Sequence, residues 1–318
     1  MNNRRGSKPS IQRSAFASYI HSAMQSDSAP LPRVEYVFET SKFRMTSRAN
    51  EARLRLTNEC PILVRPHEPF IMPTGIHFTR TPSCAFILTG ETDKDVFCHT
   101  GLIDGGYRGE IQVILLNKRK YPVTLYRGEL NICLSAFNYV LPPLRDVSFL
   151  TPPMYANDAG FDVMVMHSMV IPPTTDQPFM IYLGVETPGP PEPHVALALG
   201  RSGLASRGIV IDVSEWGPRG LQLKFYNYSG QPWLAQPGSR ICQIVFVERR
   251  HILKGFKKCL RHRKLAPGVR FREARVHFRE DTNSVRKHTH EENAVHEPNV
   301  ATASADIRGT KGLGSSGF

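Results

Sequence analysis

The sequence predicts an all-β protein made of two tandem β-barrel or jelly-roll domains that arose by internal duplication. Two observations favour this fold class. Short runs rich in Val, Ile, Leu, Phe and Tyr are separated by proline and glycine, and matching residues recur in the two halves at a nearly constant offset. The 318 residues are enough for two ordinary domains, each with its own core. We expect the first domain over residues 33–145 and the second over 146–248.

Five runs carry the clearest strand signals. Each has the length of a β-strand, and they lie among turn residues at a spacing typical of all-β proteins. In chain order they are Ile111–Asn117, Phe179–Leu183, Val195–Leu199, Leu221–Tyr226 and Ile241–Val247. Convincing helical spacing occurs only around Ile252–Leu260, and Gly255 weakens even that prediction.

The internal repeat rests on residues that keep their order at an offset of 107–111 positions. No single identity is persuasive, but their shared order makes chance a poor explanation. The aligned pairs are Ala49–Ala52 with Ala156–Ala159, Pro69 and Phe70 with Pro178 and Phe179, Gly75 with Gly184, Ala85 and Leu88 with Ala196 and Leu199, and Gln112, Asn117, Pro122 and Gly128 with Gln222, Asn227, Pro232 and Gly238. A proline-containing linker near residues 141–153 would join the two copies.

Polar residues differ between the copies in a complementary way. Gly160–Asp162 aligns with Arg53–Arg55, Gly200–Ser202 with Thr89–Glu91, and Arg240 and Gln243 with Leu130 and Cys133, whereas Asp104 and Tyr107 of the first copy align with Ser214 and Gly217. Since each polar set survives in one copy only, we expect the two halves to build one shared site.

The net charge of +12 and the pI of about 9.6 would suit a polyanionic partner. Much of this charge is crowded into residues 249–272, for which nucleic-acid binding, nuclear import and a solvated basic face remain alternatives. We expect a flexible basic and polar N-terminus over 1–32, a basic insertion over 249–274, a disordered linker over 275–307 and a glycine-rich lid over 308–318.

Targeting signals and cysteines favour an intracellular protein. The chain has no 18-residue uncharged apolar run, and its N-terminus lacks the apolar core of a secretory signal. Its six cysteines are scattered without a C-x-x-C pair, which favours reduced thiols over a zinc site or a disulfide framework. We therefore expect no membrane association and no secretion, and a location in the cytoplasm, the nucleus or both.

Residues 101–110 form the most informative short segment. Gly101, Leu102 and Ile103 are followed by Asp104, two glycines and Tyr107, just before a predicted strand. Glycines let a ligand approach the backbone, a carboxylate can activate water, and an aromatic face can pack on a sugar or base. A β-turn with a solvated aspartate is the alternative interpretation.

Together with four other segments, this one resembles the motifs of the deoxyuridine triphosphatase (dUTPase) family, and most of all its gammaherpesvirus members. The other four are Asp158–Asp162, Gly200–Ala205, Gly238–Gln243 and Arg308–Gly317. Here the segment at 101–110 precedes the other four, which is the herpesvirus order. The resemblance implies a monomer in which a duplicated chain supplies from two halves what trimeric relatives assemble from several subunits.

The resemblance also implies a role for each site residue. Asp104 would be the catalytic base and bind the sugar 3′-hydroxyl, Tyr107 would pack against the deoxyribose, and backbone groups of Gly101, Leu102, Ile103 and Gly106 would read the uracil edge. Arg201, Ser202 and Gly203 would cradle the triphosphate, Asp162 would reach Mg²⁺ through water, and Gln243 would join the same network. A turn-capping aspartate, a core-facing tyrosine and a surface salt bridge are the alternatives for Asp104, Tyr107 and Arg201, while Arg240 would be structural or phosphate-binding.

The C-terminal segment would act as a lid over the bound nucleotide, because a long polar tether separates it from Gln243. Its contacts would come from Arg308, Gly312, Leu313, Gly314, Ser315 and Ser316. The family usually has a phenylalanine where this chain has Leu313. We therefore expect a weaker lid contact, or its replacement by Phe318.

The function implied is that of a dUTP diphosphatase, a hydrolase that uses Mg²⁺ to convert dUTP to dUMP and pyrophosphate. This reaction limits uracil in DNA and supplies dUMP for dTMP synthesis. A viral protein acting mainly through unidentified host-protein partners is the alternative from another class, and a dCTP deaminase is a third. The substrate would be dUTP, and no nucleic acid would be required.

Overall fold

The computed structural model describes residues 33–47, 53–81, 84–143, 147–184, 194–248 and 270–273. These residues form β-strands joined by turns, with one four-residue helix among them. The prediction of an all-β fold is confirmed. The predicted N-terminal extension, the disordered linker, the lid and most of the basic insertion lie outside the described residues.

The five runs predicted as strands in the whole chain all match observed strands to within one residue at each end. In the first half the strands follow one another closely. The first-half strands are β1 (Arg33–Phe38), β2 (Phe43–Met45), β3 (Arg53–Asn58), β4 (Ile62–Val64), β5 (Phe70–Arg80), β6 (Ala85–Glu91), β7 (Val96–Cys98), β8 (Gly101–Ile103), β9 (Glu110–Asn117), β10 (Val123–Leu125) and β11 (Asn131–Phe137).

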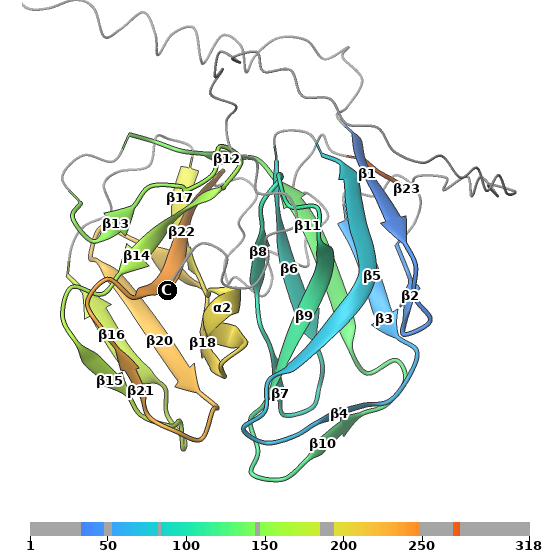
Figure 1. Cartoon of the computed structure of the whole chain (residues 1–318), viewed down its shortest axis with the longest axis horizontal. Helices are drawn as coiled ribbons and strands as arrows, with labels where there is room; N and C mark the ends of the chain where they lie inside the picture. Colours follow the sequence, from blue (N-terminus) through green and yellow to red (C-terminus); the bar gives the residue numbers. More distant parts are fainter. Residues whose placement is uncertain are drawn as a thin grey trace, which may run out of the picture. The chain divides into compact units, whose positions relative to one another are not determined.

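The second half repeats this density of strands, as Figure 1 shows in yellow-green to orange. Its elements are β12 (Tyr139–Val140), β13 (Leu150–Thr151), β14 (Gly160–Met164), β15 (Met169–Ile171), β16 (Phe179–Leu183), β17 (His194–Leu199), α2 (Ser202–Ala205), β18 (Ile209–Ile211), β19 (Ser214–Trp216), β20 (Leu221–Asn227), β21 (Trp233–Ala235) and β22 (Arg240–Glu248). A last strand, β23 (Arg270–Glu273), pairs in parallel with β1.

The two halves contain the same groups of strands in the same order. The sheet β2-β3-β11-β6-β8 of the first half matches β13-β14-β22-β17-β19 of the second, where β12 also pairs with β22. The hairpin β4–β10 matches β15–β21, and the strands β5-β9-β7 match β16-β20-β18. This agreement is what an internal duplication requires.

One pair of aligned asparagines makes the same hydrogen bonds in both halves. Each ends a strand, and each side-chain amide donates to a backbone carbonyl in the neighbouring hairpin and to a second carbonyl four residues further along. Asn117 donates to Val64 and Tyr121, both at 2.8 Å, and Asn227 donates to Ile171 at 2.9 Å and to Gln231 at 2.8 Å. At this turn the two halves therefore share hydrogen bonds as well as sequence.

Sheet register corrects two aligned pairs near the middle of the repeat, Ala85 with Ala196 and Leu88 with Leu199. Phe86 lies opposite Ala136 of β11, and Ala196 lies opposite Phe246 of β22. All four side chains belong to the core of their own half. Phe86, and not Ala85, is therefore the counterpart of Ala196, and the same shift by one residue makes Ala198, and not Leu199, the counterpart of Leu88.

The same register also moves the counterpart of Asp104. Ile103 lies opposite Phe86, and Trp216 lies opposite Ala196, so Asp104 corresponds to Gly217 and not to Ser214. The following strands begin their core-facing series at Ile111 and Leu221. The turn of the second half is three residues shorter, which is why nothing there replaces Tyr107.

Four buried clusters organise the described residues. Each half has its own core, and two further clusters join the two halves. Along β6 the side chains alternate: Phe86 and Leu88 pack into the first core, whereas Ala85 and Ile87 pack against Val195 and other residues of the second half. Because both faces of these strands are buried, they read as continuous apolar runs in the sequence.

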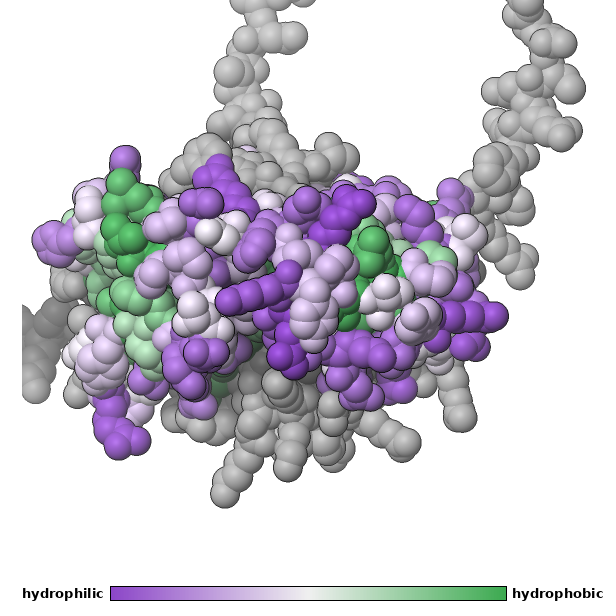
Figure 2. All heavy atoms as spheres, turned by 90° about the horizontal axis from the view of Figure 1, so that it is seen from below, coloured by the Kyte–Doolittle hydropathy of each residue, from purple (hydrophilic) through white to green (hydrophobic). Residues whose placement is uncertain are grey.

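Some large hydrophobic side chains remain at the surface, among them Leu63 of β4, Val170 of β15 and Leu234 of β21. Seen from below, hydrophobic side chains gather in separate patches among hydrophilic ones (Figure 2). No helix in the described part of the chain is long and apolar enough to cross a membrane.

Candidate active site

The turn after β8 is held in shape by its own backbone and by an arginine that sequence reasoning missed. The Tyr107 N–H donates to the Asp104 carbonyl at 3.0 Å. The Arg108 guanidinium donates to the carbonyls of Gly105 at 2.8 Å and Tyr107 at 2.9 Å, and to the Thr81 hydroxyl at 3.2 Å. These bonds fix the turn that presents Asp104.

Asp104 reaches from the first half into the second. Its side chain is 3% exposed, and Oδ1 accepts a hydrogen bond of 2.8 Å from the backbone N–H of Ala159. Ala159 lies in the second-half segment Asp158–Asp162, where Asp158 in turn accepts from the Tyr155 N–H at 3.1 Å. Two of the five predicted segments therefore meet at this hydrogen bond.

Glycines let the two halves approach closely here. A Cβ atom added to Gly106 would lie 3.1 Å from Cβ of Asn157, and one added to Gly160 would lie 3.0 Å from the Ile244 carbonyl oxygen and 3.5 Å from the Leu102 side chain. Neither glycine has a positive φ, so close packing, and not backbone conformation, excludes a larger residue.

Asp162, on β14, lies between two arginines. Its Oδ1 is 2.7 Å from Nη1 of Arg201, and its Oδ2 is 3.3 Å from Nη1 of Arg240. Gln243 lies opposite Asp162 in the strand register and hydrogen-bonds its carboxylate. The pKa of Asp162 is raised above its ordinary value, because the effect of burial exceeds the lowering effect of the two arginines and Gln243. Two cations against one anion leave this cluster with a net positive charge.

Arg201 is placed by the short helix α2, which the sequence did not predict. Arg201 precedes the helix in an extended conformation, and its carbonyl accepts from the N–H groups of Leu204 at 3.1 Å and Ala205 at 3.0 Å. Arg201 is buried, whereas Ser202 and Gly203 are partly exposed. The helix thus fixes the backbone from which Arg201 reaches Asp162.

Tyr107 makes the core contact that its alternative interpretation predicts. Its ring is half-buried and packs against the first core, and its hydroxyl donates to the Glu110 carbonyl at 3.0 Å. Gly109 leaves room for this ring, since a Cβ there would clash with it. Stacking of Tyr107 on a sugar stays a prediction.

Gly101, Leu102 and Ile103 form β8, which pairs on one side with β6 and is the last strand of its sheet among the described residues. An edge strand can present backbone N–H and C=O groups to a ligand. This position suits the predicted reading of a base edge by backbone atoms.

The side chains around Asp162 limit how the expected Mg²⁺ could be held. Both Asp162 oxygens face guanidinium groups, and the described residues contain no group of three His, Cys, Asp or Glu side chains that could hold a metal. Mg²⁺ commonly binds substrate phosphates and keeps several waters, with one or two carboxylates nearby. These residues would fit an ion that arrives with the substrate and that Asp162 would reach only through water.

The predicted residues of the lid, from Arg308 and Gly312 through Leu313, Gly314, Ser315 and Ser316, lie outside the described residues. The structure brings together Asp104 with the Ala159 segment, and Asp162 with Arg201, Arg240 and Gln243. Ala159 and Asp162 are three residues apart on one extended segment, a separation of roughly 10 Å. The acid and the arginine cluster therefore stand at two ends of one strand segment.

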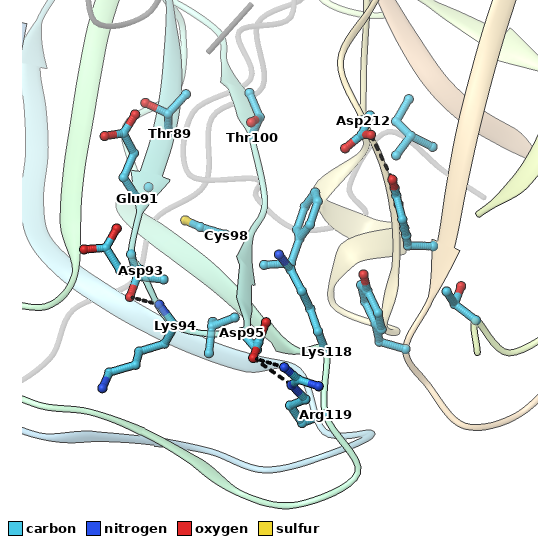
Figure 3. Close-up of a pocket in the computed structure, with 18 of the residues that line it drawn as sticks. Thr89, Glu91, Asp93, Lys94, Asp95, Cys98, Thr100, Lys118, Arg119 and Asp212 are labelled. Carbon is cyan, nitrogen blue, oxygen red and sulfur yellow. Dashed lines mark hydrogen bonds and ion pairs between the residues drawn. The ribbon is translucent and has the colours of Figure 1, made fainter. Parts of the chain in front are cut away.

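A cleft of about 1490 Å³ lies where the repeat would place a second site. The strand register corrects the alignment of Gly200–Ser202, whose counterparts are Gly90–Thr92 and not Thr89–Glu91. Val213 and Ser214 correspond to Thr100 and Gly101. Gly90–Thr92, Val213 and Ser214 all line this cleft. Glu91 and Asp212 are among the acidic groups around it, and Asp95 pairs there with Arg119 (Figure 3). The cleft has no counterpart of Asp104, since Gly217 takes that place.

The chain is similar to proteins of one family. The dUTPase family model matches residues 148–269. A deoxyuridine 5′-triphosphate nucleotidohydrolase of human herpesvirus 8 type P (isolate GK18) is 99% identical over 295 residues, covering 93% of this chain and 100% of that one. The corresponding proteins of equine herpesvirus 2 and saimiriine herpesvirus 2 are 38% and 34% identical over 90% and 91% of this chain, and 96% and 98% of theirs.

The similarity extends over both halves, and the two positions that meet across them, Asp104 and Ala159, lie in segments that the family resemblance had identified. The chain belongs to the dUTPase family, among its herpesvirus members.

Proposed function

We propose that the protein hydrolyses dUTP to dUMP and pyrophosphate. The observation that carries this proposal is the hydrogen bond from the Ala159 N–H to Asp104, because it joins the acid of one half to the segment of the other half that leads to the arginine cluster. The relatives at 99% and 38% identity are named for this activity.

Asp104 acts as the general base. A water molecule gives its proton to the Asp104 carboxylate as its oxygen bonds to the α-phosphorus, and the bond from that phosphorus to the bridging oxygen breaks, releasing pyrophosphate. A positioned carboxylate contributes about 10²–10⁴-fold in rate in this role. The hydrogen bond from Ala159 orients the Asp104 side chain for it.

Arg201 and Arg240 bind the triphosphate. In the described state each faces Asp162, at 2.7 and 3.3 Å. A guanidinium offers several donors, so Arg201 can keep Asp162 while it turns other N–H groups to phosphate oxygens. Gln243 keeps Asp162 oriented. Asp162 would reach Mg²⁺ through water, and this ion would supply further charge neutralisation.

The base is read by backbone groups at the edge of β8, and Tyr107 supports the turn beneath the sugar. The glycine-rich C-terminal segment, with Arg308 and Leu313, would close over the nucleotide. We further propose that one chain forms one complete site as a monomer, because the contacts between its own halves already join the catalytic segments.

The test follows pyrophosphate release by the purified full chain from dUTP, dCTP, dTTP and UTP, with Mg²⁺ and after its removal by EDTA. We expect a clear preference for dUTP and a strong loss of rate with EDTA. Equal rates with all four nucleotides would refute the proposal. Mass measured in solution tests the monomer, which a stable trimer would contradict.

A further inference from the structure

His99 is a buried histidine of the first half that no predicted role includes. It lies between β7 and β8, is 3% exposed, and its backbone N–H donates to the Ile114 carbonyl at 2.9 Å. Its neighbours Cys98 and Thr100 line the cleft of Figure 3, whereas His99 is not among the residues lining that cleft. Its ring instead lies against Gly200 of the second half.

The ring of His99 is neutral at neutral pH. Burial lowers its pKa from 6.5 to about 4. Neither ring nitrogen has a hydrogen-bond partner among the described residues. A buried polar ring without such partners is unfavourable, so its presence calls for a function other than filling space.

Gly200 shows what the ring does. A Cβ atom added to Gly200 would lie 2.9 Å from Cε1 of His99, closer than real Cβ contacts, and 3.3 Å from Nδ1, which is tighter than most of them. The φ angle of Gly200 is outside the left-handed region, so its backbone would accept any residue. The His99 ring, and not the backbone, therefore requires glycine at position 200.

The residue after Gly200 is Arg201, whose guanidinium faces Asp162 at 2.7 Å. Because Gly200 rests on His99, the position of the ring sets where the chain enters α2 and how far Arg201 reaches. A displacement of about 1 Å at such a positioning group can cost on the order of 10²-fold in rate.

We propose that His99 is a positioning residue of the active site, which reaches across from the first half to set the Gly200–Ser202 segment for the triphosphate. The inference rests on the proposed dUTP hydrolysis. It assigns His99 no contact with the reacting atoms.

The experiment is a double-mutant cycle on the full chain, with Gly200→Ala, His99→Ala and the double variant. Steady-state kinetics with dUTP give kcat and KM separately. We expect Gly200→Ala to lower kcat/KM at least about tenfold, mainly through KM, and to have no further cost in the His99→Ala background, which non-additivity between touching residues predicts. A Gly200→Ala penalty of equal size in both backgrounds would overturn the proposal, as would no penalty in the wild-type background.

Gly217→Ala is the matched control, since a Cβ there would meet nothing within 4 Å. Thermal unfolding of every variant reports folding. If Gly200→Ala does not fold but the double variant does, the coupling is supported; if neither folds while His99→Ala does, it is refuted. Failure of the proposed function can be distinguished from failure of this inference, because the wild-type protein would then not hydrolyse dUTP.

Discussion

The proposed active site, where Asp104 meets the Ala159 segment, and the cleft of Figure 3 are built from corresponding strands, yet only the first has the predicted acid and arginines. At the active site the β8 turn of the first half meets the α2 segment of the second. At the cleft, β19 takes the place of β8, and the loop after β6 takes the place of α2. A scaffold can thus be duplicated while the reactive groups are kept in one copy each.

Three exchanges separate the two regions. The register places Glu91 at the position of Arg201, Arg55 at that of Asp162 and Gly217 at that of Asp104. A carboxylate in place of the proposed phosphate-binding arginine would repel a triphosphate. Without a counterpart of the proposed base, a nucleotide in the cleft would not be hydrolysed. The comparison therefore predicts large effects at the first region and small ones at the second.

The largest expected effect is that of Asp104→Asn. Asparagine can still accept the hydrogen bond from Ala159, but it cannot take a proton, so kcat should fall about 10²–10⁴-fold while the melting temperature changes little. Pyrophosphate release and thermal unfolding measure both. Asp93→Asn in the cleft is the control, and near-normal turnover of Asp104→Asn would remove Asp104 from the mechanism.

Arg201→Gln should come next. Removing the guanidinium takes a phosphate ligand from the substrate and leaves Asp162 with Arg240 as its remaining cation, so kcat/KM should fall about 10–100-fold with a loss of roughly 3 kcal/mol in stability. Glu91→Gln is the counterpart at the cleft and should change kcat/KM less than about twofold. Equal effects of the two variants would break the comparison.

The pH dependence of the free energy of unfolding tests whether His99 is buried against Gly200 of the second half. Because burial lowers its pKa from 6.5 to about 4, the unfolded chain binds more protons between these values than the folded one. Stability should be fully present above pH 6.5 and fall as the pH drops towards 4, by at most about 1.4 kcal/mol per pH unit from this group.

Burial is the cause of this lowered pKa, and a side chain without a titratable group would not show it. His99→Gln should therefore show a smaller loss of stability than the wild type between pH 7.5 and pH 5. Urea unfolding at both pH values measures this difference. Identical losses in the two proteins would mean that His99 is not held neutral in the folded state.

The smallest effect is expected for Asp212→Asn. Asp212 is the counterpart of His99, accepts a hydrogen bond of 2.9 Å from the Tyr226 hydroxyl, and lies at the cleft. The variant should lose about 0.5–1.5 kcal/mol in stability at most, with kcat/KM unchanged. A large change in kcat/KM would show that the cleft communicates with the active site.

Much of the fold could be predicted because its signals are local. Apolar runs such as Ile111–Asn117 and Ile241–Val247, bounded by turn residues, mark strands whatever they pair with. The repeat predicted two halves, and the polar residues that occur in only one of the two copies predicted a shared site. Asp104, Asp162 and Arg201 could be proposed as site residues because the chemistry of the family needs those residue types in those segments.

The strand register, and the contacts that hold the site segments in place, could not be predicted from such local signals. Asp104 was aligned with Ser214 because the two turns differ in length, and only pairing across β17 and β19 shows that Gly217 corresponds to it. The helix α2 is too short to show a period, and the role of Arg108 depends on carbonyls that a turn brings to it.

The sequence by itself determined the all-β class, the two related halves and the residue types that the reaction needs. The tertiary structure decided how the halves meet: that Asp104 is held by the Ala159 N–H, that Asp162 faces two arginines, and that Gly200 rests on His99. The physical reason is that these contacts join residues far apart in the chain, and their geometry depends on the packing of both halves together.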